Sequence, residues 1–443
     1  MVNKINDAVE KHRQLILDAE RYIWQNPETG YKEFKTSKYL AEKFEALGYK
    51  LTYAEGITGF YTVIDTGRPG PEILVMGEMD SVICPSHPES DPITGAVHSC
   101  GHNAQSATLL GIAAALCEEG ILDSLCGRIK LCAVPAEELL EIEFRQELKK
   151  EGKIKYLGGK SEFLHRGYFD GADMALLVHT AKGFSCGNDH VGCLVKRIIY
   201  KGKAAHAGGN PAGGINALYA ASCGLQAANA LRETFRENDL IRFHPIITHG
   251  GDMVNAIPET AVIESYVRGK SFEAIVRENK KINRALVGAA LSLGANVEII
   301  DMPGYSPLVD DLNMAAVVSE AAKLVDPSLI LPVSSPWSTG STDMGDLCYL
   351  MPTIQPYAGG AVGTGHGNDY YIVDPDAACV KNAKWQIMTI ALLLENGAER
   401  AKKIIADFKP KFASAREFLD YQDSLNDSGD RITYKDGEAV ARL

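Results

Sequence analysis

Ile73-Leu74-Val75-Met76-Gly77-Glu78-Met79-Asp80 is the stretch from which the fold can be predicted. Its first four residues form a short, continuous apolar run, which is typical of a strand buried on both faces of a parallel sheet. The run ends in an acidic loop, and open α/β sheets place their functional groups at the carboxyl ends of such strands. The stretch therefore predicts an α/β protein with a polar site just beyond this strand.

Two later segments repeat the arrangement. Residues Arg128–Val134 predict a second strand, which Glu137 and Glu138 follow, and Met174–Val178 predict a third, which His179 follows. Because the carboxyl ends of parallel strands meet at one edge of a sheet, we expect these side chains to lie close together.

Cys100-Gly101-His102 places a thiol and an imidazole two residues apart, just before a helix predicted over Asn103–Glu119. This is metal-ligand spacing, but alone it is ambiguous, because a free cysteine is usually a small buried hydrophobe. A late strand-like segment, Thr353–Tyr357, leads through a glycine-rich turn to a further imidazole, that of His366. Together with the residues at the other strand ends, these donors predict a metal site.

The pattern changes in the middle of the chain. Strand-like alternation and helical periodicity there predict the order β-α-β-β-α-β of a ferredoxin-like sandwich. We therefore expect a main domain from 1–188, an inserted domain from 189–302, and the rest of the main domain from 303–443. The charged residues from about Phe412 onward predict a peripheral, partly mobile C-terminal extension.

Composition excludes several classes of partner. A net charge of -12 and a pI near 5.5 argue against nucleic acid and anionic membrane. The ten cysteines form no C-x-x-C repeat, which predicts reduced thiols rather than a disulfide framework. The start of the chain is polar and no apolar run has the length of a membrane span, so we expect a cytoplasmic protein.

Eight motifs, in order, are Trp24-Gln25-Asn26-Pro27-Glu28, Glu33-Phe34-Lys35-Thr36, Gly77–Asp80, His98–Asn103, Pro135–Glu138, Gly202–Ala207, Asn255–Pro258 and Ser341–Asp346. With these motifs the chain, over nearly its whole length, resembles the metal-dependent amidohydrolases and aminoacylase-like peptidases, which include hippurate, auxin-conjugate and aminobenzoyl-glutamate hydrolases. The resemblance implies a mixed-sheet α/β/α metallopeptidase catalytic domain with an inserted ferredoxin-like α+β domain that serves as lid and dimerisation domain. The aminobenzoyl-glutamate branch is nearest, since it too carries Ser-Cys-Gly-His-Asn.

The resemblance also implies two divalent metal ions per subunit, Zn²⁺ or Mn²⁺. In similar enzymes five side chains hold them, and the matching positions here are Cys100, His102, Glu138, His179 and His366. Five ligands suit two ions when one ligand bridges, and the Cys100 thiolate is the expected bridge.

Further roles follow from the same resemblance. Glu137 is the expected general base for an activated water, and Asp80 is expected to orient a ligand histidine. His206 and Asn255 would reach the active site of a partner subunit and stabilise the oxyanion, which implies a homodimer. Arg268 is our candidate for the residue that binds the carboxylate of a small substrate, which would be an N-acyl amino acid or a dipeptide.

Three positions depart from the wider family. Asn103 and Gln105 stand where an aspartate and a histidine are usual, and Glu78 stands where some relatives carry a metal-binding histidine, so we do not assign it to the metal. Two alternatives stay open: a non-catalytic ligand-binding or heterodimer subunit of the same fold, and a metal-free cysteine hydrolase with Cys100 as nucleophile and His102 as base. The acyl group, the amino acid and the native metal are not determined by the sequence.

Overall fold

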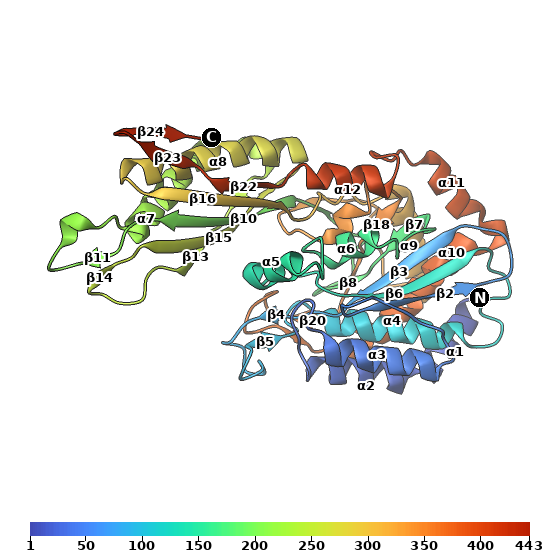
Figure 1. Cartoon of the computed structure of the whole chain (residues 1–443). Coiled ribbons are helices and arrows are strands. Elements are labelled where there is room, and N and C mark those ends of the chain that lie inside the picture. The colour runs from blue at the N-terminus through green and yellow to red at the C-terminus, as the bar shows by residue number, and fades with distance from the viewer. The chain divides into compact units, whose positions relative to one another are not determined.

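The computed structural model describes residues 1–443, which divide into two compact units (Figure 1). Unit 1 comprises residues 1–189, 308–337 and 342–418, and unit 2 comprises residues 190–307, 338–341 and 419–443. Each unit has a hydrophobic core of its own. The predicted fold class, an α/β domain interrupted by an α+β insertion, is confirmed.

Unit 1 is built on a six-stranded mixed sheet in the order β1-β2-β6-β3-β7-β18. Its strands are Thr52–Tyr53 (β1), Phe60–Asp65 (β2), Glu72–Glu78 (β3), Arg128–Val134 (β6), Met174–Leu176 (β7) and Thr353–Ile354 (β18). β3 pairs in parallel with β6 and β7, and β7 pairs in parallel with β18, whereas β1 and β2 run antiparallel to their neighbours. β3 is buried along its whole length, as its apolar run predicts.

Helices surround this sheet. They are Val2–Lys11 (α1), Arg13–Trp24 (α2), Phe34–Ala46 (α3), His102–Leu116 (α4), Ile142–Lys150 (α5), Gly159–His165 (α6), Leu312–Val325 (α9), Asn382–Leu394 (α10) and Glu399–Asp407 (α11). A further helix, Ala415–Asp423 (α12), begins in unit 1 and ends in unit 2. α4 packs on β3 and is covered by α1, α2 and α10, so it is buried all round (Figure 1). The apolar periodicity over Ile5–Gln25 predicts one helix, but the backbone turns at His12 and forms two.

Unit 2 follows the predicted β-α-β-β-α-β order. Its elements are Gly192–Lys201 (β10), Ala217–Ala230 (α7), Arg242–Phe243 (β12), Ile246–His249 (β13), Thr260–Gly269 (β15), Phe272–Ser292 (α8), Asn296–Pro303 (β16) and Asp427–Asp430 (β22). The antiparallel sheet has the order β12-β15-β10-β16-β22, with β13 also paired to β15, and α7 and α8 pack against it. The strand-like pattern of Ile241–Thr248 predicts one strand, but the two short strands β12 and β13 form there instead.

The C-terminal segment differs from its prediction. Residues 419–443 belong to unit 2, because β22 adds to the edge of β16 and Ile432 is buried in the core of that unit. The chain then ends in a hairpin of Ile432–Lys435 (β23) and Glu438–Ala441 (β24). Its Asp436-Gly437 turn has positive φ at both residues, the conformation that favours a two-residue hairpin loop.

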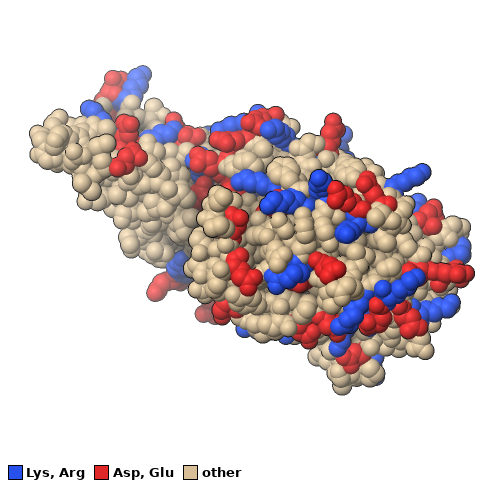
Figure 2. All heavy atoms as spheres, turned by 90° about the horizontal axis from the view of Figure 1, so that it is seen from below, with Lys and Arg blue, Asp and Glu red and all other residues tan.

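The surface carries charges of both signs. On the face shown in Figure 2, Lys and Arg side chains are interspersed with Asp and Glu, and no continuous basic area covers that face. This distribution agrees with the net charge of -12. Among the helices of the chain, none combines the length and the apolar character that crossing a membrane requires.

Candidate metal centre and active site

Side chains that could hold a metal ion gather beyond the carboxyl ends of β3, β6 and β7 in unit 1. His102 is the first residue of α4, and Cys100 lies two residues before it. Glu138 follows β6, and His179 begins the short strand His179–Thr180 (β8). His366 lies on the loop between Ala361–Val362 (β20) and Tyr371–Ile372 (β21). The five predicted ligands therefore meet in one place although they come from five separate segments.

Gly101 provides the turn between Cys100 and His102. Its φ of 85° lies in the left-handed region that favours glycine. A Cβ at this position would lie 2.5 Å from Oη of Tyr370 and 2.8 Å from Cβ of Thr180. Only glycine fits here, and it allows α4 to begin directly after the cysteine.

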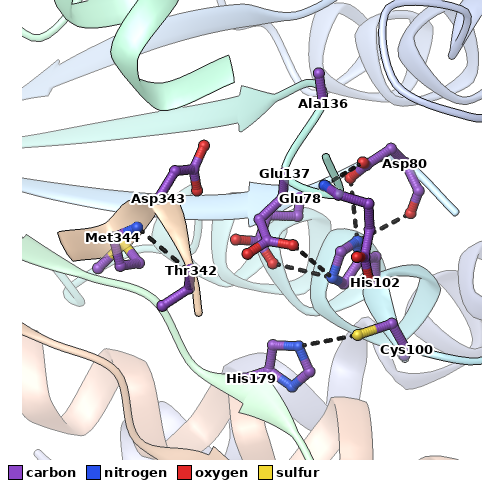
Figure 3. Close-up of polar contacts among 12 residues, drawn as sticks. Glu78, Asp80, Cys100, His102, Ala136, Glu137, His179, Thr342, Asp343 and Met344 are labelled. Atoms are coloured by element: carbon purple, nitrogen blue, oxygen red, sulfur yellow. Dashed lines mark hydrogen bonds and ion pairs between the residues drawn. The ribbon is translucent and has the colours of Figure 1, made fainter. Parts of the chain in front are cut away.

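The donor atoms form two groups that share the thiol of Cys100. One group consists of Cys100, His102 and His179, and the other of Cys100, Glu138 and His366. Within each group the donor atoms lie within 4.8 Å of one another, and the same is true of a third group, which consists of Glu78, His102 and Glu137. Sγ of Cys100 is 3.5 Å from Nε2 of His179 (Figure 3), and Nε2 of His366 is 3.0 Å from Oε1 of Glu138. This arrangement suits two cations with the sulfur between them.

The chemistry of these donors fits divalent metal ions. Nε2 of His102 is buried and forms no hydrogen bond, although Oε2 of Glu78 lies 3.3 Å away, and a cation would supply the missing partner. Burial and the carboxylate of Glu138 act to raise the pKa of the Cys100 thiol, but the three site imidazoles outweigh them and lower it to about 6. The thiol is therefore largely a thiolate at neutral pH, the form that binds metal. Thiolate, imidazole and carboxylate together suit zinc and permit manganese.

The imidazoles of His102 and His179 are oriented by their second ring nitrogens. Nδ1 of His102 lies 2.9 Å from the carbonyl oxygen of Asp80 and 3.1 Å from its carboxylate Oδ1 (Figure 3). Nδ1 of His179 lies 2.8 Å from the carbonyl oxygen of Thr180. Each Nδ1–H can therefore donate a hydrogen bond, which leaves each Nε2 free to bind metal.

Glu137 lies beside the donors and is buried. Its Oε2 is 4.0 Å from Nε2 of His102. Burial, with the nearby carboxylates of Glu78 and Glu138, raises the pKa of the Glu137 carboxyl well above its usual range. A carboxylate in such surroundings accepts a proton readily, which is the property that a general base needs.

A second set of buried charges lies next to Glu137. The ammonium of Lys160 contacts the carboxylates of Glu78 and Asp343, and all three side chains are fully buried. Burial acts to raise the pKa of Glu78, but Lys160 and His102 lower it to about 2. No local sequence pattern indicates Lys160, because a buried lysine is recognised only through its partners, which are distant in the chain.

The three remaining candidates lie in unit 2. His206, in Ala205–His206 (β11), pairs with Ala256 of Ala256–Ile257 (β14), and the carbonyl oxygen of Asn255 accepts the N–H of Ala207 at 2.9 Å. His206 and Asn255 are thus neighbours, and both are exposed. Arg268 stands apart from them in β15, where its guanidinium lies 5.5 Å from the ring centroid of Tyr266 and donates to the carbonyl oxygen of Thr339 at 3.3 Å.

Comparison with known proteins adds independent findings. The family model described as peptidase family M20/M25/M40 matches residues 74–388. A Xaa-Arg dipeptidase of Mus musculus is 27% identical over 365 residues, which cover 80% of this chain and 78% of that protein. An N-acetyl-L-cysteine deacetylase of Bacillus subtilis is 28% identical over 338 residues, which cover 72% of this chain and 75% of that protein.

Solved structures share the fold. A dinuclear metal binding peptidase of the M20 family from Bacillus subtilis superposes with a TM-score of 0.62 at 18% identity, covering 87% of this chain and 99% of that one. An aminobenzoyl-glutamate utilization protein from Klebsiella pneumoniae superposes with a TM-score of 0.66 at 19% identity, covering 89% of this chain and 99% of that one.

Proposed function

The chain belongs to peptidase family M20/M25/M40 and is a hydrolase of amide bonds, and we propose that it cleaves the amide between an acyl or aminoacyl group and an amino acid with a free carboxylate. The observation that carries this proposal is the position of Glu137, a buried carboxyl beside two groups of metal donors. The two relatives, a dipeptidase and an N-acetyl amino acid deacetylase, support the substrate class.

We assign the metal donors to two divalent cations, zinc or manganese. His102 and His179 would hold one ion, Glu138 and His366 the other, and Cys100 would contribute to both. When bound, such ions polarise the amide carbonyl and lower the pKa of water to near 7.

Glu137 moves the protons of the reaction. Its carboxylate accepts a proton from the attacking water as the water oxygen bonds to the amide carbon. The same carboxyl then gives that proton to the amide nitrogen as the C–N bond breaks, which releases the amine of the amino acid and a carboxylic acid. The burial of Glu137 beside the donor atoms supports this double role, because bulk water does not compete for the proton that the group holds between the two transfers.

Unit 2 supplies the proposed polar contacts to the substrate. In a homodimer formed through this unit, His206 and Asn255 of one subunit would donate hydrogen bonds to the oxyanion in the active site of the other. Their exposure and their position side by side support that role. The guanidinium of Arg268 would bind the substrate carboxylate. The cytoplasmic location stays a prediction from the sequence.

The proposal is tested by incubating the Zn²⁺- or Mn²⁺-loaded protein with a panel of dipeptides and N-acyl amino acids and measuring the free amino acids by mass spectrometry. Hydrolysis that a chelator abolishes and metal restores is the expected result. No hydrolysis across the panel would favour the non-catalytic alternative. Hydrolysis that resists the chelator but is lost on alkylation would favour Cys100 as a nucleophile.

A further inference from the structure

Ala136, the residue before the glutamate pair, has a left-handed backbone conformation with φ of 55°. Residues other than glycine rarely adopt it, and it persists where surrounding contacts hold it in place. Pro135 and Ala136 join the end of β6 to Glu137. Its conformation therefore decides the directions in which the side chains of Glu137 and Glu138 leave the strand end.

Glu33 holds the N–H of this residue. Its Oε1 accepts the N–H of Ala136 at 2.8 Å, and its Oε2 accepts the hydroxyl of Thr58 at 2.5 Å. The side chain of Glu33 is fully buried. A buried carboxyl is costly unless it is hydrogen-bonded, and both oxygens of this one are engaged.

Helix capping does not explain Glu33. It occupies the position before α3 where acidic side chains often cap a helix, but it makes no capping bond. Glu28 does so instead, since its carboxylate accepts the N–H groups of Lys35 and Thr36 at 2.9 to 3.0 Å. The Glu33 side chain is directed to Ala136.

The carbonyl side of Ala136 is held as well. Its oxygen accepts the N–H of Gly159, the first residue of α6, at 3.1 Å. A Cβ on Gly159 would lie 1.6 Å from the carbonyl oxygen of Pro135, so only glycine allows this approach. Both peptide groups of Ala136 are therefore fixed, one by a side chain and one by backbone.

We infer that Glu33 is a positioning residue for the hydrolytic reaction: by bonding the N–H of Ala136, it keeps Glu137 directed at the attacking water while Glu138 is directed at the metal. The inference rests on the proposed function. Two consecutive side chains with different tasks need a fixed backbone between them and the strand. A displacement of about 1 Å at a reacting group can lower the rate by roughly 100-fold.

The test compares Glu33→Leu with Glu33→Gln in the metal-loaded protein. Leucine keeps the volume and removes the acceptor, so we expect kcat to fall by roughly 100-fold with KM and metal content unchanged. Glutamine keeps the oxygen that faces Ala136 and should retain most of the turnover. Burial, with a contribution from Asp80, raises the pKa of the Glu33 carboxyl to about 8, so a neutral amide is a close replacement at neutral pH.

Glu72→Gln is the matched control. Like Glu33, Glu72 is buried, and it is ion-paired with Lys130. It lies at the end of β3 that is away from the site, so its replacement should change stability and leave kcat unchanged. If Glu33→Leu does not fold, Thr58→Val frees the other oxygen of Glu33, and a smaller fall in kcat is expected.

A double variant separates positioning from general structure. If Glu33 acts through Glu137, Glu33→Leu should not lower the residual rate of Glu137→Gln any further. An equal loss in both backgrounds, a loss of bound metal, or a failure of glutamine to retain turnover would overturn the inference. If Glu137→Gln itself keeps full activity, the proposed function fails instead, which is a different result.

Discussion

The carboxylate of Asp80 lies 3.1 Å from Nδ1 of His102 through Oδ1, and its Oδ2 accepts the backbone N–H of Glu138 at 2.8 Å. One side chain just beyond the end of β3 therefore orients two of the proposed metal ligands: it contacts the ring of His102 and the backbone N–H of Glu138. All three residues are buried. Water does not compete for these hydrogen bonds, so each is stronger than an exposed one.

Asp80→Asn is expected to weaken metal binding by about 10- to 100-fold, because the amide cannot accept the ring N–H as strongly as a carboxylate does. Titration calorimetry with Zn²⁺ and Mn²⁺ on the metal-free protein measures the change. Asp311→Asn, which alters a carboxylate that caps α9, is the control and should leave the affinity as it is. Equal affinities for wild type and Asp80→Asn would contradict the orienting role.

Glu137→Gln is expected to lower kcat by roughly 100- to 10,000-fold while both metal ions stay bound, since the amide cannot accept the water proton. Glu138→Gln, one residue away, should instead lose metal. Turnover assays paired with elemental analysis distinguish the two variants. If Glu137→Gln also loses metal, the division of roles between the neighbouring glutamates is wrong.

Cys100→Ser tests the sharing of one thiolate between both donor groups. Because Cys100 belongs to both, its replacement should weaken binding of both ions, whereas His179→Ala should weaken one. In Co²⁺-loaded protein the serine variant should also lose the thiolate-to-metal charge-transfer absorption. A serine variant that still binds one ion with unchanged affinity would show that the sulfur does not bridge.

Lys160→Met is expected to destabilise the metal-free protein by about 3 to 5 kcal/mol at neutral pH, because it leaves the buried carboxylates of Glu78 and Asp343 without their cation. Burial acts to raise the pKa of Glu78, but Lys160, together with His102 and His179, lowers it to about 2, below the usual value of 4.5. The Glu78 contribution to stability is therefore present above pH 4.5 and is lost as the pH falls towards 2.

Urea unfolding of the wild type and Lys160→Met between pH 3 and pH 7 checks this sign. The difference in free energy of unfolding should be largest at neutral pH and should shrink as the solution becomes acidic. Lys32→Met, which removes a partly exposed ion pair with Glu141, should cost only about 0 to 1 kcal/mol. A difference that does not vary with pH would argue against an ionised Glu78.

The strand pattern of the sequence was sufficient to predict which strand-end residues of unit 1 meet at the site. Asp80, Glu137 and His179 each follow a short apolar strand, and parallel strands bring such positions to one edge whatever the details of packing. This prediction does not depend on the order of the strands in the sheet. The same argument could not give distances or the direction in which each side chain points.

The roles of Glu33 and Lys160 were missed for a physical reason. Each is a charged residue whose role depends on a partner from a distant segment, Ala136 and Asp343 respectively. No local pattern distinguishes such a residue from an ordinary surface charge. The break between α1 and α2 was missed because the apolar periodicity continues across it.

A last prediction concerns strand β22 near the C-terminus. Strand β22 covers the edge of β16 that would otherwise expose unpaired N–H and C=O groups, and such edges promote association between chains. A chain ending at Asn426 lacks β22, and we expect its light scattering to rise with concentration. A chain ending at Asp430 keeps β22 but loses the same β23–β24 hairpin, including the buried Ile432, and should scatter as little as the full chain. If both truncations aggregate equally, the lost core contact of Ile432 rather than the open edge is responsible.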